Sequence, residues 1–438
     1  MERFSLPGRG VAYGTQFGLH LLNIPAGGMS AFPEQPDHFL HWAQANYDAG
    51  TTEDDFLPRR IYGQYVESVL REAVETHGNP VEWRQDEALS IYQVDDHVEV
   101  RLRSGPKIVA DKVVLATGNF HPSDPDMPGR KRSDKRYVPY AWSAGALQGV
   151  EEESSILLIG SGLTSVDTAL ALRAREFRGT IHVLSRRGVI PEWHKKTTVW
   201  PTFWSKDSGP TTVRGLVKLV RAQGALAAKQ GIDWRPVVDA LRPVSGDIWH
   251  ALSAAEKRRF LRHLRPYWEV HRHRVSPKIG SLMLYQVLRD DMQVHTGRVV
   301  GYQEFPEAVE VTIRDRRAAR EKTILVERII NCTGPETDCR RLDESLITNL
   351  IAQGLARPDA LFLGLDVNDE GALMDHQGAP STRIYTLGPP RKGQLWETTA
   401  VPEIRVQVAG LARQLLERTA ALPVVSETQT TEEAAPAA

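Results

Sequence analysis

The segment of this 438-residue chain whose spacing most clearly indicates chemistry is a glycine-rich turn, Gly160–Ser161–Gly162–Leu163–Thr164–Ser165. The first glycine permits a tight turn, and the second lets main-chain N–H groups approach a pyrophosphate at the positive end of a helix dipole. Ser165 replaces the usual third glycine, and a small side chain is tolerated where helix meets strand. The turn predicts a dinucleotide site; a sharp strand-to-helix turn without ligand is the alternative. The predicted contacts are Gly160, Gly162, Leu163, Thr164 and Asp167.

The segments around this turn have the order that such a site needs. An apolar strand is predicted at residues 156–159, a helix follows the turn to about residue 175, and a second strand covers 180–184. Strand, turn, helix and strand fit into about thirty residues, the size of a βαβ unit. This context makes the glycine turn more than a chance match.

The end of the second strand bears on which dinucleotide is bound. An acidic residue there would bind the ribose 2′-hydroxyl of NAD, whereas arginine accommodates the 2′-phosphate of NADP. Ser185, Arg186 and Arg187 supply a hydroxyl and two cations without a carboxylate. The sequence therefore favours NADPH over NADH; two solvated surface arginines are the alternative.

Two other apolar strands end in a Thr–Gly turn, at Thr117–Gly118 and at Thr333–Gly334. A glycine at a strand end lets the main chain lie close to a cofactor, although either turn alone is an ordinary strand end. The two turns flank the predicted NADP unit. They therefore suggest that the chain leaves one domain, builds another and returns.

A series of motifs covers nearly the whole chain. They are Gly8–Thr15 (GRGVAYGT), His20–Ala26 (HLLNIPA), Met29–Phe32 (MSAF), Ala116–Asn119 (ATGN), Gly160–Asp167, Thr386–Pro389 (TLGP) and Trp396–Arg405 (WETTAVPEIR). In this order they resemble the flavoproteins in which an NADP domain is inserted into an FAD domain. More narrowly, the chain resembles the FAD/NAD(P)-binding family that includes FAD-dependent urate hydroxylase and aspartate N-monooxygenase.

The resemblance implies an FAD site. Gly388 and Pro389 would lie near the ribityl and pyrophosphate groups, and the helix after Thr399 would direct its N-terminus at the isoalloxazine. The residues implied to line FAD are Gly8, Arg9, Gly10, Asn23 and Pro25. Glu2 falls where the acid for the adenosine ribose would lie, but the family's opening strand, glycine turn and helix do not precede it. A late start codon, a truncated product and a true short form that binds FAD poorly are the alternatives.

The predicted fold class is α/β, with two Rossmann-like dinucleotide-binding domains and a helical excursion. Residues 1–150 would form the first FAD segment and 151–330 the NADP domain, with the excursion at about 205–290. Residues 331–422 would complete the FAD domain, and 423–438 would form a disordered tail. A helix is predicted at 60–77, β-structure at 81–115, loops over 1–56 and one strand at 324–331.

Composition excludes several other classes. The charge of −1 gives no global attraction to nucleic acid or to an anionic membrane, and two cysteines cannot form a disulfide scaffold. No apolar run is long enough to span a membrane, no secretory signal or metal-ligand pattern is found, and a cytoplasmic location is expected. One stretch, 256–278, holds eight Lys or Arg and three His against two Glu. It is either a solvated helix face or a basic wall for an anionic substrate or the NADPH phosphates.

The leading hypothesis is an FAD- and NADPH-dependent monooxygenase that uses O2 to hydroxylate a small polar substrate. A reductase or dehydrogenase without oxygen insertion is one alternative, and a non-catalytic nucleotide-binding short form is another. The sequence names no catalytic acid or base, no substrate and no oligomeric state.

Overall fold

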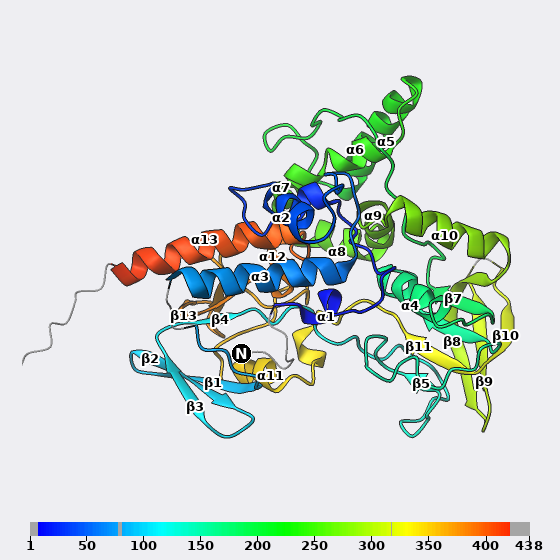
Figure 1. Cartoon of the computed structure of the whole chain (residues 1–438), viewed down its shortest axis with the longest axis horizontal. Coiled ribbons are helices and arrows are strands. Elements are labelled where there is room, and N and C mark those ends of the chain that lie inside the picture. Colours follow the sequence, from blue (N-terminus) through cyan, green and yellow to red (C-terminus); the bar gives the residue numbers. More distant parts are fainter. Residues whose placement is uncertain (1–7, 78–80, 317, 421–438) are drawn as a thin grey trace, which may run out of the picture.

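The computed structural model describes residues 8–77, 81–316 and 318–420 (Figure 1). Glu2 and the expected tail at 423–438 lie outside these residues. The described chain forms three sheets with helices packed around them, and helices α5 and α6 extend away from the rest. No helix within the described ranges is long and apolar enough to cross a membrane.

The largest sheet has seven strands in the order β10-β9-β8-β7-β6-β11-β5. Five of them run parallel: β8 (Met292–Glu304), β7 (Ile181–Ser185), β6 (Ile156–Ile159), β11 (Arg328–Asn331) and β5 (Tyr137–Val138). All four residues of β6 are buried, because both faces of a parallel sheet are covered. β5 belongs to this sheet although it precedes the expected boundary at residue 150.

The two faces of this sheet are covered differently. Helices α4 (Leu163–Arg173) and α10 (Pro277–Leu288) pack on one face, where Leu158, Leu170 and Ile279 share a core. The other face is covered by the second half of β8 with the antiparallel strands β9 (Val309–Asp315) and β10 (Glu321–Val326), whose Val311 packs with Leu157.

The single strand expected at 324–331 is wrong. Residues up to Val326 belong to the edge strand β10, whereas β11 lies between β6 and β5. Glu327, whose N–H donates to the Ser155 carbonyl, separates them. The first half of β8 pairs with β7, and its second half pairs with β9. The second half of β8 therefore covers one face of the parallel sheet together with β9 and β10, and the chain continues from β10 to β11.

A second sheet joins distant parts of the sequence. Its order is β12-β13-β4, and β4 (Val113–Leu115) runs parallel to β13 (Pro380–Thr386), while β12 (Ala372–Met374) is antiparallel. Helix α13 (Val401–Ala420) packs on it. The chain therefore leaves this sheet after β4 and returns to it at β12.

The remaining β-structure is a three-stranded meander. Its strands are β1 (Ala88–Val94), β2 (His97–Leu102) and β3 (Lys107–Ala110), which share a core with α11 (Ser345–Ala352). The β-structure predicted at 81–115 is therefore present.

The N-terminal segment folds against α3 (Arg59–His77), which confirms the predicted helix. Its other elements are α1 (Gly10–Tyr13), the 3-10 turn η1 (Ala26–Gly28) and α2 (His38–Asn46). Phe39 of α2 and Tyr65 of α3 are fully buried in one core. The loop prediction for residues 1–56 missed α2, which is short and has no side-chain hydrogen bond at its N-cap, Asp37.

The helical excursion lies between β7 and β8. It contains α5 (Val213–Lys229), α6 (Arg235–Asp239), η2 (Arg242–Val244), α7 (Ser245–Ala251), α8 (Ala254–His263), α9 (Arg265–Arg272) and then α10. Ser253 caps α8, and the Glu256 carboxylate accepts a hydrogen bond from the Val213 N–H at the start of α5. One polar side chain thus joins two helices of the excursion. The turns η3 (Cys339–Arg341) and η4 (Pro389–Arg391) and helix α12 (Lys392–Leu395) complete the described elements.

Candidate dinucleotide site

The glycine turn follows β6 and leads into α4. Gly160 has φ +109°, and a Cβ there would lie 2.4 Å from the Cys332 carbonyl oxygen. Glycine is therefore required at position 160, because the end of β6 packs closely against the end of β11. The turn is held at both sides, since the Gly160 N–H donates to Leu184 and the Cys332 N–H to Ile159.

Gly162 has different surroundings. It is the N-cap of the 11-residue helix α4, its φ of −82° suits any residue, and a Cβ there would have no atom within 4 Å. No contact within the protein therefore requires glycine, but a close ligand would. The first N–H groups of α4, at Leu163 and Thr164, have no intrahelical partners and lie at the positive end of its dipole. Residues and geometry fit a phosphate group.

The turn lies at the point where the strand order reverses. From β6 the chain proceeds through α4 to β7 and β8 on one side, whereas β11 and β5 lie on the other. The carboxyl ends of β6 and β11 are level, because Ile159 pairs with Asn331. In α/β sheets ligands bind in the crevice at such a switch point.

The Thr333–Gly334 turn follows β11 and lies beside the glycine turn, at the same edge of the sheet. The Asn331 Oδ1 accepts hydrogen bonds from the N–H and the hydroxyl of Thr333 (3.1 and 2.6 Å), which fixes the turn. Gly334 is exposed, and a Cβ there would also have no neighbour within 4 Å. Sequence reasoning did not assign this role to Asn331, although an asparagine before a Thr–Gly turn is a suitable signal.

The basic end of β7 lies on the other side of the glycine turn. Ser185 accepts a hydrogen bond from the Gly188 N–H (3.0 Å), Arg186 is exposed, and the Arg187 guanidinium is 5.9 Å from the centroid of the Tyr267 ring. Neither arginine forms an ion pair with a described residue. Both cations are therefore available to an anionic group.

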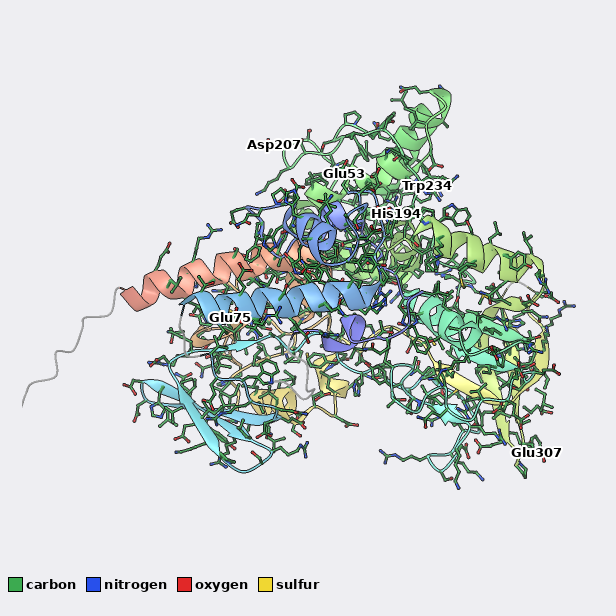
Figure 2. All side chains as sticks on the ribbon, viewed as in Figure 1. Glu53, Glu75, His194, Asp207, Trp234 and Glu307 are labelled. Carbon is green, nitrogen blue, oxygen red and sulfur yellow. The ribbon has the colours of Figure 1, made fainter. Side chains whose placement is uncertain are left out.

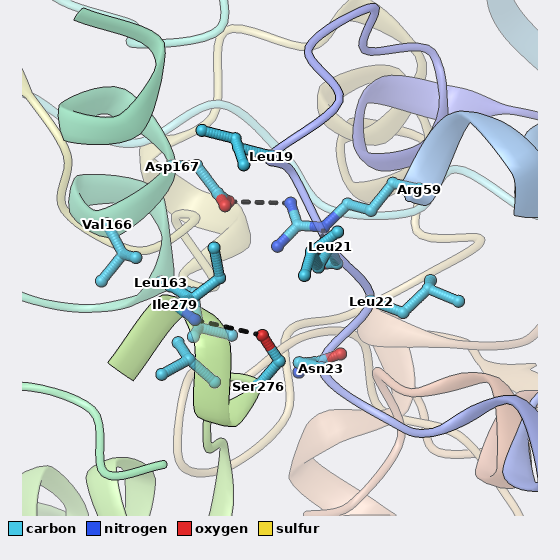
Figure 3. Close-up of a pocket in the computed structure, with 11 residues that line it drawn as sticks. Leu19, Leu21, Leu22, Asn23, Arg59, Leu163, Val166, Asp167, Ser276 and Ile279 are labelled. Atoms are coloured by element: carbon cyan, nitrogen blue, oxygen red, sulfur yellow. Dashed lines mark hydrogen bonds and ion pairs between the residues drawn. The ribbon is translucent and has the colours of Figure 1, made fainter. Parts of the chain in front are cut away.

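Asp167 has a protein partner. Its carboxylate lies 2.7 Å from the Arg59 Nη1 (Figure 3), and both side chains are about nine-tenths buried. Its carbonyl accepts a hydrogen bond from the His20 Nε2 (2.9 Å). Burial lowers the pKa of His20. These contacts join α4 to α3, and a cofactor role for Asp167 stays a prediction.

A small cavity borders this ion pair. Its walls include Leu19, Asn23 and Ser276, as Figure 3 shows, and its volume of about 10 Å³ has room for about one water molecule. It is too small to be a cofactor or substrate site.

The residues expected near FAD partly gather at the second sheet. Thr117 and Gly118 follow β4, and Gly388 and Pro389 follow the parallel strand β13, so the two turns are neighbours. Gly118 has φ +67° and open space where a Cβ would be. The main chain of Gly388 is already engaged, because its N–H donates to Gln407 (2.9 Å) and its carbonyl accepts from Thr398 (2.8 Å). Gln407 and Thr398 are further residues that the sequence analysis did not single out.

The expected FAD residues near the N-terminus are held by protein contacts. Arg9 forms a two-bond ion pair with Glu67 of α3 (2.7 and 2.6 Å), and a Cβ at Gly8 would lie 2.8 Å from Val66, whereas Gly10 has open space. The Asn23 carbonyl accepts a hydrogen bond from the His194 Nε2 (3.0 Å).

Other residues of the same expected set lie at element ends. Pro25 precedes η1, and exposed Thr399 precedes α13. Figure 2 shows His194, which comes from the loop after β7, among the side chains where that loop meets the N-terminal segment. Burial lowers the pKa of His194 to about 4, so this contact is made by a neutral imidazole.

Comparisons with known proteins agree with this architecture. Residues 1–120 match a family model described as FAD-NAD(P)-binding. The ornithine N-hydroxylase of Kutzneria sp. 744, in complex with reduced FAD, NADP+ and L-ornithine, superposes with a TM-score of 0.63 at 13% identity, covering 95% of this chain and 92% of that one. This is the fold of a two-domain flavoprotein.

Two further structures share this flavoprotein fold. The ornithine hydroxylase of Pseudomonas aeruginosa has a TM-score of 0.59 at 15% identity and covers 94% of this chain and 89% of that one. The FAD-bound cadaverine monooxygenase of Erwinia amylovora has a TM-score of 0.63 at 14% identity, with coverages of 98% and 90%. A search of curated proteins finds no match.

Within the described ranges of this flavoprotein fold, the turn at Gly160 is the one glycine turn that joins a parallel strand directly to a helix of at least eight residues, with no other element between them. A second phosphate-binding turn of this kind, for FAD, is therefore not found among the described residues. The residues present fit the dinucleotide phosphates of NADPH better than those of FAD.

Proposed function

We propose that this chain is an NADPH-dependent flavin monooxygenase acting on a small polar substrate. The observation that carries the proposal is the open space at Gly162, beside the N-terminus of α4 and at the switch point of the parallel sheet. The fold, shared with N-hydroxylating monooxygenases, supports the choice of reaction class.

In this proposal the chain's own residues bind and orient NADPH. The N–H groups of Leu163 and Thr164 hold the pyrophosphate, and Gly162 admits it. Ser185 and the guanidinium groups of Arg186 and Arg187, which form no ion pair with a described residue, take the 2′-phosphate. These contacts thereby fix the position of the nicotinamide relative to the neighbouring FAD-type segment.

The FAD-type segment would supply the second cofactor site. Thr117–Gly118 and Gly388–Pro389 form its floor at the ends of two parallel strands, and Thr399 lies at the N-terminus of α13. When bound, FAD would accept hydride from NADPH and carry the oxygen chemistry. The protein's part is to orient the ring, exclude water and present a positive helix end to it.

The purified full-length protein tests the proposal. Its visible spectrum, with and without added FAD, reports flavin binding, and NADPH oxidation is measured in air and under nitrogen. A flavin spectrum with oxygen-dependent NADPH consumption and a hydroxylated product supports a monooxygenase. Oxygen-independent turnover with an added acceptor would instead identify a reductase, and NADPH binding without flavin a nucleotide-binding protein. Absence of NADPH binding in a folded sample would refute all three.

A further inference from the structure

Helix α10 has an apolar surface on its outer side. Ile279 and Met283, on its inner side, pack in the core that this helix shares with the parallel sheet. Leu284, Tyr285 and Leu288, by contrast, are 43%, 55% and 76% exposed. Figure 1 shows α10 at the outer edge of the molecule. Neighbouring large apolar side chains that stay exposed are typical of a surface that binds another protein.

The exposed apolar residues of α10 form a narrow stripe. They lie within about 100° of one another around the helix axis, because each residue turns the helix by about 100°. Helix α13 also exposes three large apolar residues, Val406, Val408 and Leu416, but at the same periodicity they span about 160°. A narrow stripe can contact a single partner helix along its length, as in a coiled-coil seam.

Polar residues extend the stripe at both ends of α10. Ser281 and Lys278 precede it by one and two helical turns, and both are exposed. Lys278 forms no ion pair with a described residue. Beyond the C-terminal end, Asp291 pairs with Arg289 (3.1 Å), and exposed Asp290 makes this end net negative. The following residues are called the α10 face: Lys278, Ser281, Leu284, Tyr285, Leu288 and Asp291.

The apolar part of the α10 face is complementary to itself. Two copies can pack with antiparallel helices so that Leu284 of one copy faces Tyr285 of the second. The same register places Ser281 of each copy opposite Leu288 of the other. The small side chain thus faces the most exposed leucine of the stripe, which leaves room for that leucine between the two helices.

The charges at the two ends favour the same arrangement. In the antiparallel register Lys278 of each copy lies opposite Asp291 of the other, so an ammonium group without an ion-pair partner in the described chain meets an acidic end. A parallel arrangement would instead place the two Lys278 ammonium groups opposite each other. Antiparallel packing also brings the positive dipole end of each helix beside the negative end of its neighbour.

We propose that the α10 face binds a second copy of this chain and forms a two-fold symmetric dimer, in which each copy contributes the same residues. The face has far fewer residues than the about 20–30 a side of a standard interface, so the dimer is weak and exchanges with the monomer. Its dissociation constant should be on the order of 10 µM. The proposal depends neither on a cofactor nor on the proposed function.

Sedimentation velocity on the full chain tests the proposal. Between about 1 µM and about 100 µM, a range that brackets this constant, the sedimentation coefficient should rise from that of a monomer towards that of a dimer. A monomer at every concentration would overturn the proposal, because the stripe would then not bind its own copy.

A matched pair of leucine substitutions locates the interface. Leu288→Glu should weaken self-association about tenfold or more, because dimerisation would bury its carboxylate among apolar side chains. Leu416→Glu is the control, since Leu416 is 71% exposed but lies on α13. Unchanged association in Leu288→Glu, or an equal loss in the control, contradicts the assignment. If Leu288→Glu melts early, Leu288→Ser must show the loss at the wild-type melting temperature.

Mixing two charge variants tests the register. Lys278→Asp makes both ends of the face acidic, and Asp291→Lys makes both ends basic, so each variant alone should associate about fivefold to tenfold more weakly at low salt. Both substitutions suit the helix dipole, so both monomers should fold. An equimolar mixture should recover dimers, because every end then faces the opposite charge. Wild-type association of each variant alone, or no recovery in the mixture, would contradict the proposed pairing.

Discussion

Two glycines two residues apart should respond in opposite ways to the same substitution. Gly160 combines φ +109° with a virtual Cβ 2.4 Å from the Cys332 oxygen, whereas Gly162 has an ordinary φ and open space. Gly160→Ala therefore strains the backbone and pushes two adjacent strand ends apart. Gly162→Ala only places a methyl group in the space that we assign to the pyrophosphate.

The magnitudes follow from these environments. The left-handed conformation costs Gly160→Ala about 1–3 kcal/mol and the clash about as much again, so the total is on the order of 2–6 kcal/mol. For a chain of 438 residues, this lowers the melting temperature by about 2–7 °C. Alanine in place of glycine at an N-cap costs Gly162→Ala only about 1 kcal/mol. Loss of one or two charge-assisted hydrogen bonds weakens NADPH binding about tenfold to a hundredfold.

Thermal melting and calorimetric titration with NADPH separate the two effects. Gly160→Ala should melt early, while Gly162→Ala should melt near the wild-type temperature and bind NADPH poorly. An unchanged NADPH affinity in Gly162→Ala would refute the phosphate assignment. A wild-type melting temperature in Gly160→Ala would refute the packing argument.

Three more variants give distinct results. Arg186→Ala with Arg187→Ala should raise the KM for NADPH about tenfold and that for NADH little, because only NADPH carries the 2′-phosphate; steady-state kinetics with equal effects would exclude this role. Asp167→Asn should lower the free energy of unfolding by about 3 kcal/mol in a denaturant titration, since it leaves the buried Arg59 without its counter-ion. Burial lowers the pKa of His182 from 6.5 to about 4, so the unfolded chain takes up a proton that the folded chain does not. The melting temperature should therefore fall as the pH drops from 6.5 towards 4, and His182→Asn should reduce that fall.

Local patterns predicted the dinucleotide unit well. The apolar run of β6, the glycines after it and the helical spacing of α4 are neighbours in sequence, so their physical reasons are visible there. The strand predicted at 324–331 failed because its residues favour β-structure throughout, and only the pairing partners divide it at Glu327.

Contacts between distant residues were out of reach. Arg59 and Asp167 lie 108 positions apart, and neither residue predicts that the other is its partner. Gln407 could not be assigned to Gly388, because η4, α12 and the first residues of α13 lie between them and only the fold of this segment brings the two residues together. Arg272 was noted only as one charge in a basic stretch, and its burial beside two glutamates depends on where α9 meets α13.

The pairing of β4 with β13 also constrains the order in which parts of the chain can fold. Val113–Leu115 must wait for Ile384–Thr386 before it gains its parallel neighbour. During synthesis the intervening nucleotide unit can collapse on its own while β4 still has a bare edge, the kind of surface on which nascent chains associate wrongly. A stalled or nicked polypeptide that ends before β13 would thus expose this strand to other molecules, even if its NADP unit were perfectly formed.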